Sequence, residues 1–354
     1  MKTSKCRKTL FRITIQHLST LAKQILSAPV LGKIIFYCLP AFIFGCSRPE
    51  ETQVLQTTTV RMMENDTRAL SGQHTIDILT FNDDRLQRLD TYQRSENTTC
   101  STVEAASTAG NKIMTAIINS GIERYGWAGI NSREALAGIR ARLENEQREK
   151  PVMSGECHVT AGKSANIILR RLRSDIVIRS LRCDFRESSY DGKRILDAKV
   201  YLINVNAEAS LIDTGNGLPE RIINSGRYDP NAAACFKEPE LIFHDIPEGI
   251  GPEAIYPGIC LSCYQNESER ETPGTPFTRL VIEGSIEGHT YYWPIDINRE
   301  NGGNGIVRNN RYIYDITITE TGTSDPDRPI GRNEASIRME VKEWSEREDY
   351  GVRF

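Results

Sequence analysis

The sequence lacks the short motifs that most enzyme classes require. It contains no nucleophile elbow, no P-loop and no glycine fingerprint for a dinucleotide. Four histidines follow residue 46, and none has a His or Cys neighbour at helical ligand spacing. Cys260 and Cys263 have zinc or redox spacing, but a zinc ribbon needs a second pair and a redox pair needs a helix N-terminus, whereas this pair lies in strand-like sequence. We therefore expect a protein that is not an enzyme and has no metal and no cofactor.

Long apolar runs and clustered positive charge are missing from most of the chain. No stretch after residue 46 is long and apolar enough to span a bilayer. Of the 44 Lys and Arg side chains, seven lie in residues 1–45, which leaves 37 basic against 47 acidic side chains in the remainder. Nucleic-acid binding needs clustered cations that displace counterions, so we expect no nucleic-acid partner.

Residues 1–45 have the parts of a bacterial lipoprotein signal peptide. Their seven basic side chains precede an apolar stretch, residues 34–44, that is too short to cross a membrane as a helix. Gly45-Cys46 then resembles a lipobox, in which the cysteine is acylated and becomes the first mature residue, although Phe44 is larger than the residue usual at its place. We expect Cys46 to carry lipid and to attach the exported chain to the outer membrane. The alternative is an ordinary signal peptide or membrane anchor with an incidental cysteine.

Alternation of apolar and polar residues dominates the exported chain and is typical of half-buried strands. The predicted strands are 75–81, 195–205, 241–244, 278–286, 290–297 and 311–319, and residues 110–119 fit either a strand or a helix. Turn-forming Gly, Pro, Asn and Asp separate these segments, so the pattern predicts β-sandwiches. We place a domain boundary at 161–164, which divides the body into an N-terminal domain, 69–162, and a C-terminal domain, 163–354.

One helix is predicted from about Ser132 to Glu149. Asn131 and Glu134 have capping-box spacing, and Pro151 follows as a stop signal. The apolar stripe of this helix consists of Leu136, Ile139 and Leu143. Its other faces are charged, so we expect it to lie on the surface of a sheet.

The C-terminal third resembles the type V fimbrillins of Bacteroidota, the major fimbrial subunit family. The segments that carry the resemblance, by order and spacing, are 291–295, 307–312, 315–319, 322–326 and 341–344, with 151–155, 204–205 and 222–226 upstream. One departure is Arg173-Ser174-Asp175-Ile176, where the family more often has small and basic residues before an apolar strand.

This resemblance implies two tandem transthyretin-like β-sandwich domains with one or few surface helices. It implies export as a lipoprotein and then cleavage by an arginine-specific protease at the cell surface, which removes a lipidated propeptide, residues 46–68, together with the first strand. The C-terminal strand of a neighbouring subunit then fills the open groove. The implied partners are other fimbrillin subunits, and the implied location changes from the outer membrane to an extracellular fimbrium.

The predicted cleavage lies between Arg68 and Ala69. Residues 64–70 are polar, as an accessible loop should be, and Arg68 matches the family's processing position. Arg61 is the alternative site. The remaining alternative is that Arg68 is a solvated loop residue with no role in cleavage.

Two sets of alternating apolar residues lie in the last twenty positions of the sequence. They are Ile337, Met339 and Val341, followed by Tyr350, Val352 and Phe354. Strand addition uses apolar anchors on one face of this kind, so we predict that these residues form the donor strand. For residues 335–342 the alternative is a strand that pairs only inside its own domain.

The sequence thus favours a structural subunit of a surface fimbrium, of stalk or tip type. The alternative is an outer-membrane lipoprotein that keeps its lipid and acts as a fimbrial anchor or binds glycan or host protein. A secreted hydrolase has no motif in its favour.

Overall fold

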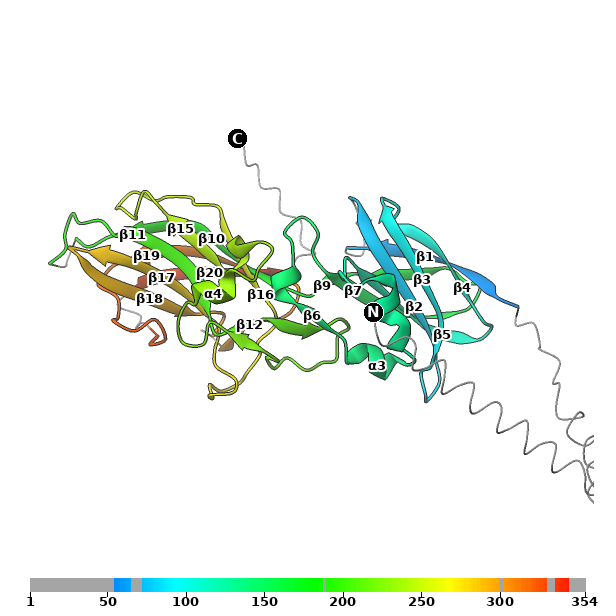
Figure 1. Ribbon diagram of the computed structural model, residues 1–354. Helices are drawn as coiled ribbons and strands as arrows, with labels where there is room; N and C mark the ends of the chain where they lie inside the picture. The colour runs from blue at the N-terminus through cyan, green and yellow to red at the C-terminus, as the bar shows by residue number, and fades with distance from the viewer. Residues whose placement is uncertain (1–53, 65–71, 187–188, 300–301, 330–334, 344–354) are drawn as a thin grey trace, which may run out of the picture. The chain divides into compact units, whose positions relative to one another are not determined.

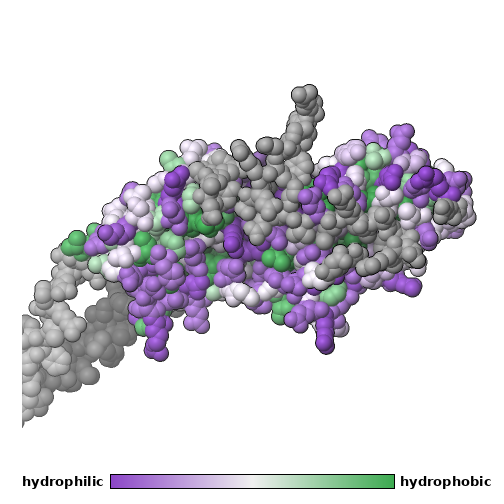
Figure 2. All heavy atoms as spheres, turned by 180° about the vertical axis from the view of Figure 1, so that it is seen from behind, coloured by the Kyte–Doolittle hydropathy of each residue, from purple (hydrophilic) through white to green (hydrophobic). Residues whose placement is uncertain are grey.

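The computed structural model describes residues 54–64, 72–186, 189–299, 302–329 and 335–343 (Figure 1). From Leu55 onward the described chain forms one compact unit, built mainly of strands with a few short helices. None of the helices in these ranges is long and apolar enough to cross a membrane. Hydrophilic side chains cover most of the described surface visible in Figure 2, and the apolar patches there are small and separate. The predicted all-β fold class is confirmed.

Two sheets are formed by the strands up to residue 171. A three-stranded sheet has the order β4-β1-β8, with β1 at Gln56–Met63, β4 at Thr102–Ser107 and β8 at Ala165–Ile168. A five-stranded sheet has the order β3-β2-β5-β7-β9, with β2 at His74–Asn82, β3 at Leu89–Thr98, β5 at Asn111–Ile118, β7 at Met153–Thr160 and β9 at Arg170–Arg171. All neighbours pair antiparallel except β1 and β8, which are parallel.

Strand alternation sorts the side chains of the five-stranded sheet between two apolar layers. On β2, Ile76 and Ile78 face the three-stranded sheet and share a core with β1, β4 and β8. Leu79 and Phe81 point the other way, into a second core. This sheet is therefore covered on both faces, which explains why β2 and β5 are almost entirely buried.

The strands from residue 174 onward form two further sheets. One has the order β16-β10-β19-β20, with β10 at Ser174–Cys183, β16 at Ile259–Cys263, β19 at Asn310–Ile318 and β20 at Ala335–Glu343. The other has the order β15-β11-β17-β18, with β11 at Leu196–Ile203, β15 at Phe243–Ile246, β17 at Arg279–Ile286 and β18 at His289–Asp296. Buried residues of both sheets, among them Ile178, Leu202 and Trp293, belong to one continuous core.

Short elements fill the connections. The two-stranded pairs are β6 (Arg140–Arg142) with β13 (Glu208–Ser210), and β12 (Val205–Asn206) with β14 (Ile222–Ile223). The helical turns are η1 (Arg124–Gly129), α3 (Arg133–Ala137), η2 (Leu143–Asn145), α4 (Pro230–Ala233) and η3 (Pro239–Leu241).

The helix predicted over residues 132–149 is wrong in length. Only α3 and the three-residue turn η2 are helical in this range, and the N-cap of α3 is Ser132, whose Oγ accepts a hydrogen bond from the backbone N–H of Ala135 at 3.2 Å. The helix ends at Gly138, and the next residues form β6, in which Ala141 is buried between two exposed arginines. Pairing of β6 with β13 supplies backbone hydrogen bonds that compete with the helix, so tertiary contacts override a helix-compatible pattern.

The other predicted elements are found as strands. Residues 75–81, 195–205, 241–244, 278–286, 290–297 and 311–319 overlap β2, β11, β15, β17, β18 and β19, and residues 110–119 contain β5. The domain boundary at 161–164 stays a prediction. Strands β8 and β9 still pair with β1 and β7 of the first two sheets. The chain therefore passes from the first two sheets to the last two at residues 172–173, just before β10 begins.

Candidate assembly site

Strand β1 lies in the middle of its sheet although it comes first in the described chain. It pairs antiparallel with β4 from Gln56 to Arg61 and parallel with β8 from Val60 to Met63. The backbone N–H of Met62 donates to Ser101 O at 2.7 Å, and that of Leu169 donates to Met63 O at 2.7 Å. Both edges of β1 are therefore hydrogen-bonded, and loss of the strand exposes backbone groups on both neighbours.

One face of β1 is part of the N-terminal core. Thr58, Val60 and Met62 have no exposed surface, and the last two contact the apolar cluster between the sheets. The Thr58 hydroxyl accepts a hydrogen bond from the backbone N–H of Gly162 at 3.0 Å. Burial of side chains of Val and Met size stabilises a fold by roughly 1.5–3 kcal/mol each. An empty β1 position is therefore an apolar groove.

The two walls of this groove are held by contacts that do not involve β1. On β4, the carbonyl of Ala106 accepts from Thr91 Oγ1 at 2.6 Å, and its N–H donates to Gln93 Oε1 at 3.0 Å. On the other side, Gly155 of β7 lets β8 approach closely, because a Cβ there would lie 2.1 Å from Ile168 O. The walls are thus anchored to the five-stranded sheet.

A polar cavity of about 530 Å³ lies where β1 ends. Its charged lining comprises Glu64, Arg148, Glu149, Lys150 and Arg171. Burial lowers the pKa of Arg171, and nearby carboxylates, Glu64 among them, oppose this shift. The cavity therefore carries more positive than negative charge while β1 is in place.

A buried ionic cluster lies next to this cavity and is built from both parts of the chain. Glu146 Oε1 accepts from Tyr264 Oη at 3.1 Å and Oε2 accepts from Val152 N at 3.1 Å, and Arg173 Nη1 is 3.8 Å from Oε2. Arg173 Nε is also 3.4 Å from Asp175 Oδ1. The side chains of Glu146, Arg173 and Asp175 are at most 3% exposed. Burial raises the pKa of Glu146 to about 7, and Arg173 partly offsets that rise.

This pKa shift predicts a pH-dependent stability. The pKa of Glu146 is higher in the folded chain than its usual 4.5, so its stabilising contribution is complete below pH 4.5 and is lost as the pH rises through about 7. We expect the free energy of unfolding to fall by about 1–3 kcal/mol over this window from this group. Glu146→Gln should remove that part of the slope in urea titrations at several pH values, whereas Glu149→Gln, on an exposed residue, should keep it. An unchanged slope in Glu146→Gln would contradict the assignment.

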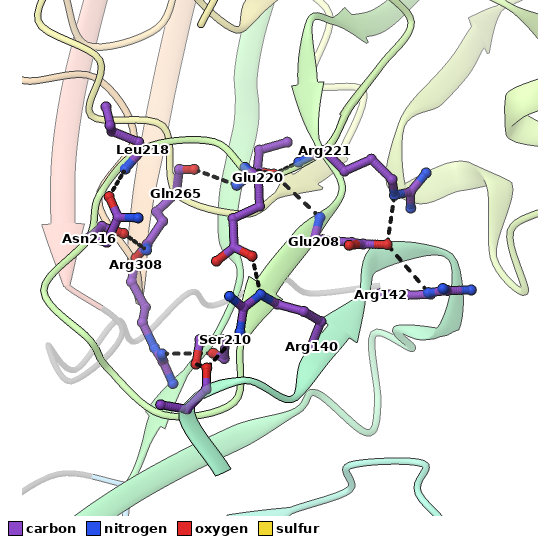
Figure 3. Close-up of polar contacts among 12 residues, drawn as sticks. Arg140, Arg142, Glu208, Ser210, Asn216, Leu218, Glu220, Arg221, Gln265 and Arg308 are labelled. Carbon is purple, nitrogen blue, oxygen red and sulfur yellow. Dashed lines mark hydrogen bonds and ion pairs between the residues drawn. The ribbon is translucent and has the colours of Figure 1, made fainter. Parts of the chain in front are cut away.

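The predicted helix segment instead carries charged contacts from β6 to β13 and to residues 220–221 (Figure 3). Arg140 pairs with Glu220, and Arg142 and Arg221 approach Glu208 at 3.4 and 2.9 Å. These exposed or half-buried pairs each contribute little to stability, roughly 0–1 kcal/mol.

Arg308 adds a more deeply placed contact beside this group. Its Nη2 donates to Ser154 Oγ at 2.8 Å, and that hydroxyl donates to Leu211 O at 2.6 Å. Strand β7 is thereby tied to the segment after β13, so the two pairs of sheets are joined at several points.

The structure describes only part of the predicted site. Cys46, Arg68, Ala69, Tyr350, Val352 and Phe354 lie outside the described residues. Arg61, the alternative cleavage site, lies inside β1 with an exposed side chain and a backbone paired to Thr102 and Asn166. Ile337, Met339 and Val341 lie on β20, opposite Ile316, Tyr314 and Tyr312 of β19 in the same chain.

The six cysteines after residue 46 are all free thiols here. Burial raises the pKa of both Cys260 and Cys263 on β16, the opposite of the low thiol pKa that a redox pair needs. Within the described ranges, no group of three or more His, Cys, Asp or Glu side chains is placed to hold a metal.

Sequence reasoning did not identify the cavity or the buried ionic cluster. The available signal was the departure at Arg173-Ser174-Asp175, where charged residues precede an apolar strand. Charged side chains at the start of a buried strand indicate a buried ion pair, but their partner Glu146 is distant in sequence and lies in the segment predicted to form a helix on the surface of a sheet.

Comparison with known proteins places the fold. No family model and no curated protein matches the sequence. A candidate cell-adhesion protein from Bacteroides eggerthii has a TM-score of 0.62 at 14% identity, over 82% of this chain and 96% of that one. A fimbrilin from Porphyromonas gingivalis has a TM-score of 0.58 at 14% identity, over 81% and 97%. The tip fimbrial protein of the same species, with a C-terminal truncation, has a TM-score of 0.50 at 12% identity, over 82% and 100%.

These matches define the class of fold. The chain has a fimbrillin-type fold, shared with fimbrial and cell-adhesion proteins of Bacteroidota over most of its length. At 12–14% identity the likeness concerns the fold, so residue roles rest on the geometry above.

Proposed function

We propose that this chain is a structural subunit of a cell-surface fimbrium, of stalk or tip type, in the type V fimbrillin family. It is exported as a lipoprotein through Cys46 and polymerises when a strand of a neighbouring subunit replaces β1. The observation that carries the proposal is the place of β1, an internal strand of its sheet that precedes Arg68 in the sequence. A cut after Arg68 frees one inner strand and leaves the remaining strands covalently connected.

The geometry of β1 favours Arg68 over Arg61 as the processing site. Proteases bind extended backbone that is not already paired, and the backbone at Arg61 is paired on both sides. A cut at Arg61 would also leave Met62, a fully buried residue, in the groove. We propose that residues 46–68 are the lipidated propeptide, followed by β-sandwich domains at 69–162 and 163–354 with transthyretin-like topology.

Processing at Arg68 predicts a defined variant phenotype. Arg68→Ala should give a longer form that retains label from palmitate and forms few or no filaments, because β1 stays attached and the groove stays filled. Subunit mass and electron microscopy of shed filaments would report this, with Arg61→Ala as the matched control that processes normally. Cys46→Ser in the same background should lose the label. Filaments of normal subunit mass from Arg68→Ala would exclude this site.

Strand β20 is already paired with β19 in its own chain, which bears on which residues form the donor strand. Release of Ile337, Met339 and Val341 to a neighbour would break the nine-residue pairing of β20 with β19, whereas Tyr350, Val352 and Phe354 lie beyond that strand. We therefore propose that residues 348–354 supply the first anchors and that β20 remains in its own chain or follows only after docking.

The alternative function is an outer-membrane lipoprotein that keeps β1 and acts as a fimbrial anchor or binding module. The paired, buried β1 is compatible with it, because in an unprocessed chain β1 itself fills the position between β4 and β8 and the core beneath it. N-terminal sequencing of the protein in surface filaments separates the two, since a first residue of Ala69 supports the polymerising subunit and lipidated Cys46 supports the anchor.

A further inference from the structure

The cavity at the end of β1 changes charge when β1 leaves. Its charged lining has three cations, Arg148, Lys150 and Arg171, and two carboxylates, Glu64 and Glu149. Glu64 lies on the removed side of the processing site, so strand removal takes one of the two carboxylates away. Of the three cations that remain, Arg148 and Arg171 are half-buried and favour a new carboxylate at this position.

The spacing along β1 relates this carboxylate to the buried anchors. Val60 and Met62 point into the core, and Glu64 follows two residues later at the cavity. An incoming strand therefore fits both the groove and the cavity under two conditions. Its apolar anchors occupy alternate positions, and a carboxylate lies two residues from the anchor nearest the cavity.

Residues 348–354 have this spacing in the reverse direction. Glu348 precedes Tyr350 by two positions, and Val352 and Phe354 continue the alternation. A strand that runs opposite to β1 places Glu348 in the cavity, Tyr350 in the place of Met62 and Val352 in the place of Val60. The edges of β4 and β8 offer N–H and C=O groups that pair in either direction.

We propose that the cavity is a carboxylate-binding site of the assembly groove, and that Glu348 of a neighbouring copy occupies it beside Arg171 and sets the direction and register of the donor strand. This inference rests on the proposed strand replacement and adds the chemistry that the partner strand must carry. Glu343 has the same offset from Val341 in the direction of β1, but its strand β20 is paired with β19, so Glu348 is favoured.

A peptide-exchange experiment tests the site. The full chain carries a cleavage site for a sequence-specific protease within residues 65–71, is cut after folding, and is mixed with a fluorescent peptide of residues 345–354 with an amidated end. Anisotropy reports binding as the peptide displaces β1. Glu348→Gln in the peptide should weaken binding about tenfold, because it removes a charge-assisted contact. Asp349→Asn removes the same charge from the opposite face and should have little effect.

The protein side supplies a second arm. Arg171→Gln should weaken wild-type peptide binding and abolish the difference between the wild-type and Glu348→Gln peptides, whereas Arg170→Gln, at the exposed neighbouring residue, should preserve it. Equal binding of the two peptides to the unmodified protein would overturn the carboxylate site and leave strand replacement intact. If the 345–354 peptide fails to bind the cut protein while a peptide with the sequence of β1 binds it, the donor role itself is overturned. Stronger binding of a 335–345 peptide that depends on Glu343 would replace Glu348 as the occupant and reverse the strand direction.

Discussion

Removal of residues 348–354 is expected to abolish filaments while the unprocessed chain melts within about 2 °C of the wild type. Tyr350, Val352 and Phe354 are the proposed donor anchors, and each would contribute roughly 1.5–3 kcal/mol when fully buried in a neighbour, before the cost of ordering the strand. The backbone ladder adds to this, since β4 and β8 each lose a partner when β1 leaves. The unprocessed chain keeps β1 in the groove, so the deletion leaves its core complete. Electron microscopy and calorimetry measure the two effects.

A matched pair of triple variants separates the anchors from the mere presence of the segment. Serine at positions 350, 352 and 354 should abolish filaments as the deletion does. Serine at positions 349, 351 and 353 changes the opposite face of the same strand and should leave filaments intact. Filaments that persist in the first variant would refute the donor role. A large loss of monomer stability would show instead that this segment belongs to its own domain.

Arg173→Leu is expected to destabilise the folded chain by about 3–5 kcal/mol, because it leaves Glu146 and Asp175 buried without their shared cation. A change of this size corresponds to a fall in melting temperature of roughly 6–20 °C for a unit of this length. The loss should shrink at low pH, where Glu146, whose pKa is raised to about 7 by burial, takes up a proton.

Two further variants test whether the cost comes from uncompensated charge. Combining Arg173→Leu with Glu146→Gln and Asp175→Asn should recover a large share of the loss, since no buried charge then lacks a partner. Arg170→Leu, at an exposed neighbour on β9, should change the melting temperature little. Equal effects of Arg170→Leu and Arg173→Leu would show that the cluster is not important for stability. Because Glu146 lies in one part of the chain and Arg173 at the start of another, the cluster couples the two pairs of sheets.

The sequence by itself determined most of the strands. Alternation at 75–81, 278–286 and 311–319 predicted β2, β17 and β19, because one face of each strand is buried and a period of two then follows from backbone geometry. It also determined the absence of enzyme motifs and the acidic composition of the body, both of which depend only on which residues are present. The resemblance in the C-terminal third likewise agreed with the fimbrillin-type fold.

Tertiary structure decided the features in which distant residues meet. The segment after Gly138 satisfies a helical pattern, yet it pairs as β6 with β13, far along the chain, because backbone pairing outweighs local propensity. Glu146 resembles a solvated residue in sequence, and only its approach to Arg173 and Tyr264 makes it a buried charge. The central place of β1 depends on β8, much later in the sequence, which closes its second edge. Sequence period shows which face of a strand is buried, but neighbours and charge partners are fixed only by the folded chain.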